Sequence, residues 1–256
     1  MCAYLKKTFF IFTIIFFSTR TSFCYDSNFL NNKNNNKYIY SVHRLDESMR
    51  IDGNWEKVQW KKIEFIKLEN YMGPLPDPFP KTQVKLCYDD NYLYVIFRVE
   101  DRYVRAVAKE TNGRVWEDSC VEFFFTPGPD INQGYFNIEI NCKGTLLFQY
   151  HKRNRTKEGF VDLPDCNQLE IAHSLKKNVE EEIQEPVTWT LEYRLPFHIL
   201  EKYMKVEKPG SGIIWRANFY KCADKTSHPH WLTWAPVDYP KPNFHLPQFF
   251  GFLEFK

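Results

Sequence analysis

Hydrophobic and polar residues alternate along much of the chain, which is the pattern of β-strands that bury one face. The stretch Trp116–Pro127 is the clearest example. Side chains alternate along a strand, so one apolar face is made by Val121, Phe123 and Phe125. The opposite face carries Cys120, Glu122 and Phe124. We expect the first face in the core and the second on a surface beside Trp116.

A second alternating strand is predicted over Tyr135–Cys142. Its apolar face consists of Phe136, Ile138, Ile140 and Cys142. Its polar face consists of Tyr135, Asn137, Glu139 and Asn141. A row of planar hydrogen-bonding groups fits a lined binding surface, and it fits a simple solvated face equally well.

Other segments follow the same pattern. A hairpin is expected with strands Val84–Tyr88 and Tyr92–Val99 around a turn at Asp89–Asn91. Further strands are predicted at Thr145–Tyr150, Leu169–Leu175, Val187–Arg194, Ile213–Tyr220 and Gln248–Phe255. Apolar residues at helical spacing predict one short helix within Pro196–Met204. The proline-rich run Gly73–Pro80 and the charged segment Arg153–Asn167 are expected to be loops.

Short strands, frequent turns and a single short helix predict an all-β fold. We expect an antiparallel β-sandwich of the jelly-roll or immunoglobulin-like type, with an up-and-down barrel as the alternative. A tight turn is predicted at Ile51–Trp55, and Trp55 and Trp60 are expected to anchor the core. The length of the segment 38–256 suits one domain.

The N-terminal segment has the pattern of an export signal. Lys6 and Lys7 precede the apolar run Phe9–Phe17, which is too short to span a bilayer. We predict a signal peptide over residues 1–24 and an Asn-rich linker over residues 25–37. The expected location is secreted, periplasmic or at the cell envelope. Lipidation of Cys24 ranks second, because bulky Phe23 stands where a small residue is needed.

Charge and composition narrow the classes of partner. Aromatic residues make up 18% of the chain, which favours β-structure. Without the signal segment, 31 basic residues face 32 acidic ones. A near-neutral chain gives no reason to expect nucleic acid, and it predicts membrane association only through lipidation at Cys24. We expect a monomer.

Metal and thiol chemistry gives weak signals. Five cysteines follow the signal segment without a Cys-x-x-Cys spacing, so at least one thiol should be unpaired. His228 and His230 have chelating spacing, but a surface loop is the better interpretation. Glu117, Asp118 and Asp130 offer oxygen ligands for calcium, although they form no EF-hand pattern.

Aromatic rings beside carboxylates favour sugar binding. Rings cover the apolar faces of a pyranose, and carboxylates accept hydrogen bonds from its hydroxyl groups. Trp116 with Glu122 fits this chemistry, although a Trp at a strand edge is more often part of the core. Phe244 lies in a proline-stiffened loop, where it either meets a ligand or packs beneath the loop. Glu122 and Glu139 on neighbouring strands also fit a glycoside hydrolase pair.

Four motifs together resemble carbohydrate-binding modules of family 9. They are Ile51–Trp55, Tyr88–Val95, Trp116–Glu122, and the C-terminal stretch that begins with Asn243–His245 and ends with Gly251–Phe255. The resemblance implies a β-sandwich that binds a sugar, often at a chain end, between Trp116 and Phe244. Family members usually have Trp at the second position.

The resemblance also implies roles for other residues and groups. Glu122 matches the carboxylate that contacts the sugar, and Asn137 stands where some members have a basic ligand-binding residue. Structural calcium is implied, without ligands that can be assigned. Modules of this kind often accompany glycoside hydrolases and support polysaccharide catabolism.

The sequence therefore predicts an exported, non-catalytic module for a mono- or oligosaccharide. Trp116 and Phe244 are expected to stack on the sugar, while Glu122, Asn137 and Glu139 bind its hydroxyl groups. Two alternatives remain, namely a glycoside hydrolase acting through Glu122 and Glu139, and an adhesion or structural domain of the cell envelope.

Overall fold

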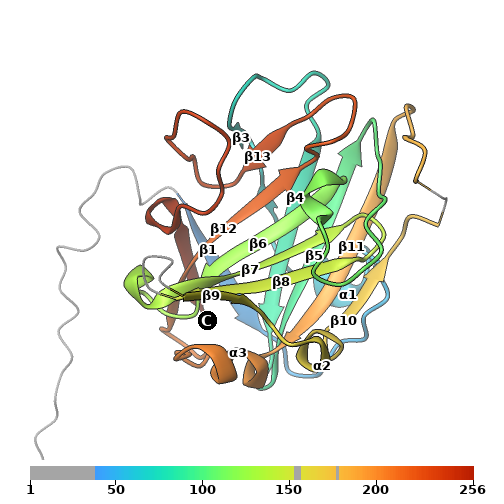
Figure 1. The fold of residues 1–256 in the computed structure, drawn as a ribbon. Helices are drawn as coiled ribbons and strands as arrows, with labels where there is room; N and C mark the ends of the chain where they lie inside the picture. Colours follow the sequence, from blue (N-terminus) through green and yellow to red (C-terminus); the bar gives the residue numbers. More distant parts are fainter. Residues whose placement is uncertain (1–37, 153–156, 177–178) are drawn as a thin grey trace, which may run out of the picture. The chain divides into compact units, whose positions relative to one another are not determined.

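Strands dominate the part of the chain that the computed structural model describes, which comprises residues 38–152, 157–176 and 179–256 (Figure 1). The strands are β1 Ile39–Arg44, β2 Ile66–Lys67, β3 Asn70–Tyr71, β4 Lys81–Tyr88, β5 Tyr92–Asp101, β6 Cys120–Thr126, β7 Gly134–Asn141, β8 Leu146–Lys152, β9 Lys157–Phe160, β10 Glu170–His173, β11 Val187–Pro196, β12 Ile214–Cys222, β13 Trp231–Thr233 and β14 Gly251–Phe255. The helices are α1 Val58–Lys61, α2 Leu163–Cys166 and α3 Phe197–Tyr203. Single 3₁₀ turns are η3 Val115–Glu117, η4 Ile131–Gln133 and η5 Pro247–Phe249.

The predicted signal peptide and linker lie outside the described residues. Within the described ranges, no helix has the length and apolar character needed to cross a bilayer.

Hydrogen bonds join most strands in one path, with the order β10-β11-β5-β4-β1-β14-β12-β6-β7-β8-β9. Most neighbours are antiparallel, but β1 runs parallel to both β14 and β4. Parallel neighbours need a long crossover, and β1 reaches β4 only after α1 and two short strands. The prediction of a purely antiparallel fold is therefore wrong at β1, so the sheet is mixed.

The mixed sheet curls so that its two halves share one core. Phe97 of β5 and Phe219 of β12 have ring centroids 6.2 Å apart, although they belong to different halves. β1 connects the halves, pairing through Ile39–Val42 with β14 and through His43 and Arg44 with β4. Because the strands form one continuous path, two separate sandwich layers are not confirmed. A mostly-β fold and the short helix within Pro196–Met204 are confirmed, but the prediction of a single helix is wrong, because α1 and α2 also form.

The alternation predicted for β6 and β7 is observed, and it separates a core face from an outer face. Val121, Phe123 and Phe125 lie in the main core, and their neighbours Glu122 and Phe124 face the other way. β7 follows the same rule, because Phe136, Ile138 and Ile140 enter the main core. A second, smaller apolar cluster covers the outer face of β6, β7, β8 and β12.

The elements that the sequence did not predict are short or weakly patterned. β1 follows the Asn-rich segment and was not assigned a strand. β9 and α2 fall within Arg153–Asn167, which was expected to be a loop. β9 forms because it pairs with β8. This tertiary contact cannot be predicted from the charged sequence of the segment.

The Ile51–Trp55 turn is fixed by a carboxylate from a distant strand. Glu192 of β11 is fully buried and accepts hydrogen bonds from the backbone N–H groups of Asp52 (2.9 Å) and Gly53 (2.7 Å). The same carboxylate accepts from the indole of Trp60 (2.8 Å) and forms an ion pair with Lys57 (2.6 Å). Trp60 is buried, as predicted, and Trp55 packs against the core half-buried.

Candidate functional site

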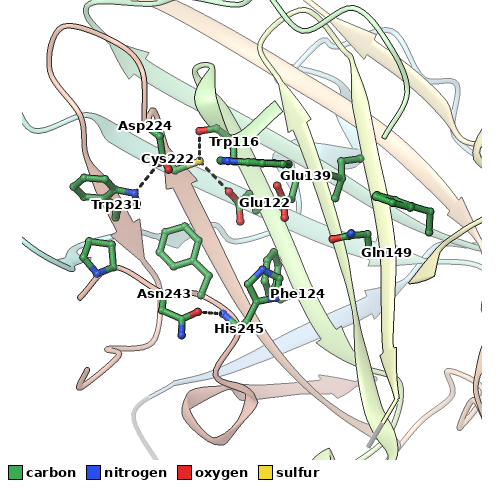
Figure 2. A pocket seen from close by; sticks show the side chains of 14 residues that line it. Trp116, Glu122, Phe124, Glu139, Gln149, Cys222, Asp224, Trp231, Asn243 and His245 are labelled. Carbon is green, nitrogen blue, oxygen red and sulfur yellow. Dashed lines mark hydrogen bonds between the residues drawn. The ribbon is translucent and has the colours of Figure 1, made fainter. Parts of the chain in front are cut away.

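A cavity of about 290 Å³ opens over the outer face of β6, β7 and β8, where loops after β12 and β13 close one side (Figure 2). Its lining is rich in aromatic and carboxylate side chains. The lining residues are Trp116, Glu122, Phe124, Glu139, Leu147, Gln149, Phe160, Cys222, Asp224, Trp231, Pro242, Asn243, Phe244 and His245. No Lys or Arg belongs to this set, so the cavity has an acidic wall.

Trp116 stands at the entrance of β6, on the turn η3. Its ring is only partly buried, and the guanidinium of Arg114 lies 5.7 Å from the ring centroid. The turn is held by Asp118, whose buried carboxylate accepts from the N–H groups of Val107 (2.9 Å) and Ala108 (3.0 Å). The Trp–Glu–Asp motif therefore combines an accessible ring with a structural carboxylate.

Glu122 and Glu139 face each other across the β6–β7 pair. Both are almost fully buried, at 2% and 5% exposure. The thiol of Cys222 donates to Glu122 Oε1 at 2.9 Å, and the amide of Asn137 donates to Glu139 Oε1 at 2.8 Å. The second oxygen of Glu139 is buried and has no hydrogen-bond partner among the described residues. This oxygen is an acceptor that a bound hydroxyl group would satisfy.

Burial governs the ionisation of both carboxyls. Desolvation raises the pKa of Glu139 to about 7, against a smaller lowering effect of the Asn137 hydrogen bond. Desolvation, followed by the neighbouring Cys222 and Glu139, raises the pKa of Glu122 well above its ordinary value. The same cause raises the pKa of Asp224. The cavity therefore contains three desolvated carboxyl groups, each of which a hydrogen bond from a bound ligand would stabilise.

Asn137 lies behind the cavity wall rather than on it. It is fully buried, and its amide N–H groups reach Glu139 Oε1 and Gln149 Oε1 (3.2 Å). Its carbonyl oxygen contacts His151 Nε2 at 2.8 Å. The geometry makes Asn137 a residue that orients two lining side chains, which differs from the direct sugar contact implied by the resemblance.

Phe244 lines the cavity but is held by the protein itself. Its ring is 8% exposed and stacks on Tyr220 with a centroid distance of 4.0 Å. The hydroxyl of Tyr220 donates to the backbone oxygen of Phe244 at 3.2 Å. Phe244 therefore packs beneath its loop and presents only a small part of its ring.

Several lining residues were not among the predicted site residues. Figure 2 shows Gln149 on one side of the two glutamates and Trp231 with Asn243 on the other. The indole of Trp231 donates to Asp224 Oδ1 at 2.7 Å. Gln149 follows from the register of β7 and β8, which pairs it with Asn137. Asp224 lies beyond the end of β12, in a position that the sequence pattern does not define.

The metal candidates named from the sequence do not assemble into one site. His230 is buried, and its Nε2 lies 2.7 Å from Lys221 Nζ. The ring of His228 stacks on Tyr103 with a centroid distance of 3.6 Å. Glu117 and Asp118 precede β6 whereas Asp130 follows it, and a seven-residue strand spans about 23 Å. These three carboxylates do not fit a single calcium ion. Calcium remains an expectation without assigned ligands.

The β-rich fold and a cavity lined by aromatic rings and carboxylates are the features expected of a carbohydrate-binding module. The sequence profile of carbohydrate-binding family 9 matches residues 48–255, and the chain belongs to that family.

Several known proteins are similar to this chain in sequence or structure. A protein from Bacteroides uniformis, whose proposed role is carbohydrate binding, superimposes with a TM-score of 0.75 at 31% identity over 86% of this chain and 99% of that one. A family 9 module from Caldicellulosiruptor kristjanssonii in complex with cellotriose has a TM-score of 0.57 at 17% identity, over 85% and 93% of the two chains. A protein of Arthroderma benhamiae named extracellular protein is 25% identical over 199 residues, which cover 73% of this chain and 84% of that protein.

Proposed function

We propose that the protein is an exported, non-catalytic module that binds a neutral sugar or the end of an oligosaccharide, in support of polysaccharide catabolism. The observation that carries this proposal is the unpartnered oxygen of Glu139, which is buried in a cavity beside Trp116. The complexes of related modules with cellotriose and glucose support a glucose-type ligand. The extracellular relative supports export.

The roles of the lining residues follow from their chemistry. The accessible ring of Trp116 stacks on the sugar, and Glu122, Glu139 and Gln149 bind its hydroxyl groups. Trp231 and Asn243 close the opposite side of the cavity. A ring covers on the order of 50 Å² of apolar sugar surface, worth about 1 kcal/mol. With hydrogen bonds to charged groups and the cost of association, we expect a Kd of roughly micromolar to millimolar.

Trp116→Ala tests the proposal. We expect binding of cellotriose or glucose to weaken about tenfold or more, because the variant loses the stacking surface and opens the carboxylates to water. Titration calorimetry measures the affinity, and thermal unfolding checks the fold. Phe65→Ala is the matched control. This exposed aromatic residue directly precedes β2 and does not line the cavity. Equal affinity in Trp116→Ala and Phe65→Ala would contradict the proposal.

The acidic wall predicts discrimination against anionic sugars. Glucuronic acid should bind about tenfold or more weakly than glucose at neutral pH, because its carboxylate would lose its hydration beside Glu122, Glu139 and Asp224 without a lining cation to compensate. Competition calorimetry measures the ratio. Glucuronamide, which has the same shape without the charge, should bind more tightly than glucuronic acid. If glucuronic acid bound more tightly than glucuronamide, the acidic wall would not be what determines sugar selectivity.

Glycoside hydrolysis is the second candidate, favoured by the cross-strand pair Glu122 and Glu139. That reaction needs one protonated carboxyl and one carboxylate, in environments that push their pKa values apart. Here burial raises both pKa values, and no cation of the described residues is among the main causes of either shift. The geometry therefore supports binding better than catalysis. Release of reducing sugar that is lost in Glu122→Gln would reverse this order.

An adhesion or structural domain remains the third candidate. It would be favoured by a folded protein that binds none of the sugars on a glycan array with calcium present or absent. The feature that favours this candidate is Phe244, whose ring stacks on Tyr220 and so leaves little surface for a sugar.

A further inference from the structure

Two cysteines and a glutamate form a compact donor cluster at the floor of the cavity. Cys120 and Cys222 are directly opposite each other on β6 and β12, and both are buried as free thiols. One donor atom each from Cys120, Glu122 and Cys222 lies within 4.8 Å of the others. In the described part of the chain, no other group of three such side chains is this compact.

The donor spacing is close to that of a tetrahedral zinc site. Zinc binds sulfur at about 2.3 Å and carboxylate oxygen at about 2.0–2.2 Å, so its ligand atoms lie about 3.6–3.8 Å apart. The Cys222 sulfur already lies 2.9 Å from Glu122 Oε1, and Figure 2 shows this contact at the cavity wall. Rotamer shifts of about 1 Å would bring three donors around one ion.

The surroundings leave a fourth position on the cavity side. Cys222 and Glu122 line the cavity, whereas Cys120 lies behind them. Glu139, opposite Glu122, has a buried oxygen without a partner. This oxygen is a separate observation of an unmet demand for a cation or a hydrogen-bond donor in the cavity that Glu122 and Cys222 also line. A water molecule or a sugar hydroxyl group would fit the fourth position.

We propose that Cys120, Cys222 and Glu122 bind a thiophilic divalent cation of the zinc class. Two sulfur donors select against calcium and magnesium, which take oxygen ligands. Binding replaces two S–H bonds by metal–sulfur bonds and releases the two thiol protons to solvent. The site is distinct from the calcium expected for the family, and it goes beyond the sugar-binding proposal.

Cobalt and zinc titration of the reduced protein tests the proposal. We expect one equivalent of Co²⁺ to produce a thiolate-to-metal charge-transfer band in the near ultraviolet, and Zn²⁺ to displace it. Cys222→Ser and Cys120→Ser should each weaken zinc binding about 100-fold or more, since loss of an outer-shell partner alone costs 10–100-fold. Cys166→Ser is the matched control, because this buried cysteine, which donates to the backbone oxygen of Val161, belongs neither to the donor cluster nor to the cavity lining.

Two further variants separate this proposal from sugar binding. Trp116→Ala should weaken cellotriose binding and keep the cobalt band, while Glu122→Gln should weaken both. Thermal unfolding confirms that each variant folds. A reduced, folded protein without the charge-transfer band would overturn the proposal, as would equal zinc affinity in Cys222→Ser and Cys166→Ser.

Discussion

Glu192→Ala should lower the free energy of unfolding by about 3–5 kcal/mol, the largest effect expected of any substitution considered for this protein. The variant would remove the acceptor of two backbone N–H groups and of the Trp60 indole, all at 2.7–2.9 Å. Each buried donor left without a partner costs about 1–3 kcal/mol. Lys57, whose side chain is 12% exposed, would keep its ion pair with Asp52 and its hydrogen bond to the backbone oxygen of Arg50.

Urea unfolding measures this loss, and Glu170→Ala is the matched control. Glu170 also forms an ion pair across neighbouring strands, with Arg194, but both side chains are partly exposed. A pair of that kind contributes about 0–1 kcal/mol. If the two variants differed by less than about 1 kcal/mol, the Ile51–Trp55 turn would not depend on the buried carboxylate.

This turn also shows where sequence patterns stop being informative. Asp52 and Gly53 predict a turn by their local conformational preferences. Nothing local identifies Glu192, which lies 139 residues beyond Gly53, as the group that closes it. The alternation in β6 and β7 was sufficient to separate core from surface, because burial acts on every second residue.

The candidate site shows the same division. Trp116, Glu122 and Glu139 were predicted from residue type and strand position, and the structure brings them to one cavity. Asp224 and Cys222 reach that cavity only through the pairing of β12 with β6. The parallel placement of β1 was also unpredictable, since it depends on β14 at the far end of the chain. Long-range pairing, rather than local pattern, decides these features.

The second large effect concerns Glu139 and pH. The Glu139 carboxyl has a pKa near 7 in the folded protein and an ordinary value of 4.5. Between these pH values the folded state holds a proton that the unfolded state has released, so the stability of the protein falls as pH rises. The contribution of Glu139 is fully present below about pH 4.5 and is lost above about pH 7, and it amounts to about 3 kcal/mol.

Glu139→Gln should therefore stabilise the protein by up to about 3 kcal/mol at pH 8 and change it little at pH 4. The glutamine retains an acceptor for Asn137 and replaces the unpartnered oxygen by a donor that faces Glu122. Unfolding curves at both pH values measure the difference. Glu69→Gln is the control, because its exposed carboxylate should make the substitution nearly neutral at either pH.

The same variant should bind sugar more weakly, by about 10–100-fold at pH 8, if the ionised oxygen of Glu139 accepts a hydroxyl group. A gain in stability together with a loss of sugar affinity would identify Glu139 as a binding residue. If its role were only structural, the substitution would change the stability and leave the affinity unchanged. A buried carboxylate oxygen that lacks a donor lowers the stability of the free protein, and a sugar that supplies this donor restores the stability on binding. Glu139→Gln with full sugar affinity would leave the stability prediction intact and remove Glu139 from the binding site.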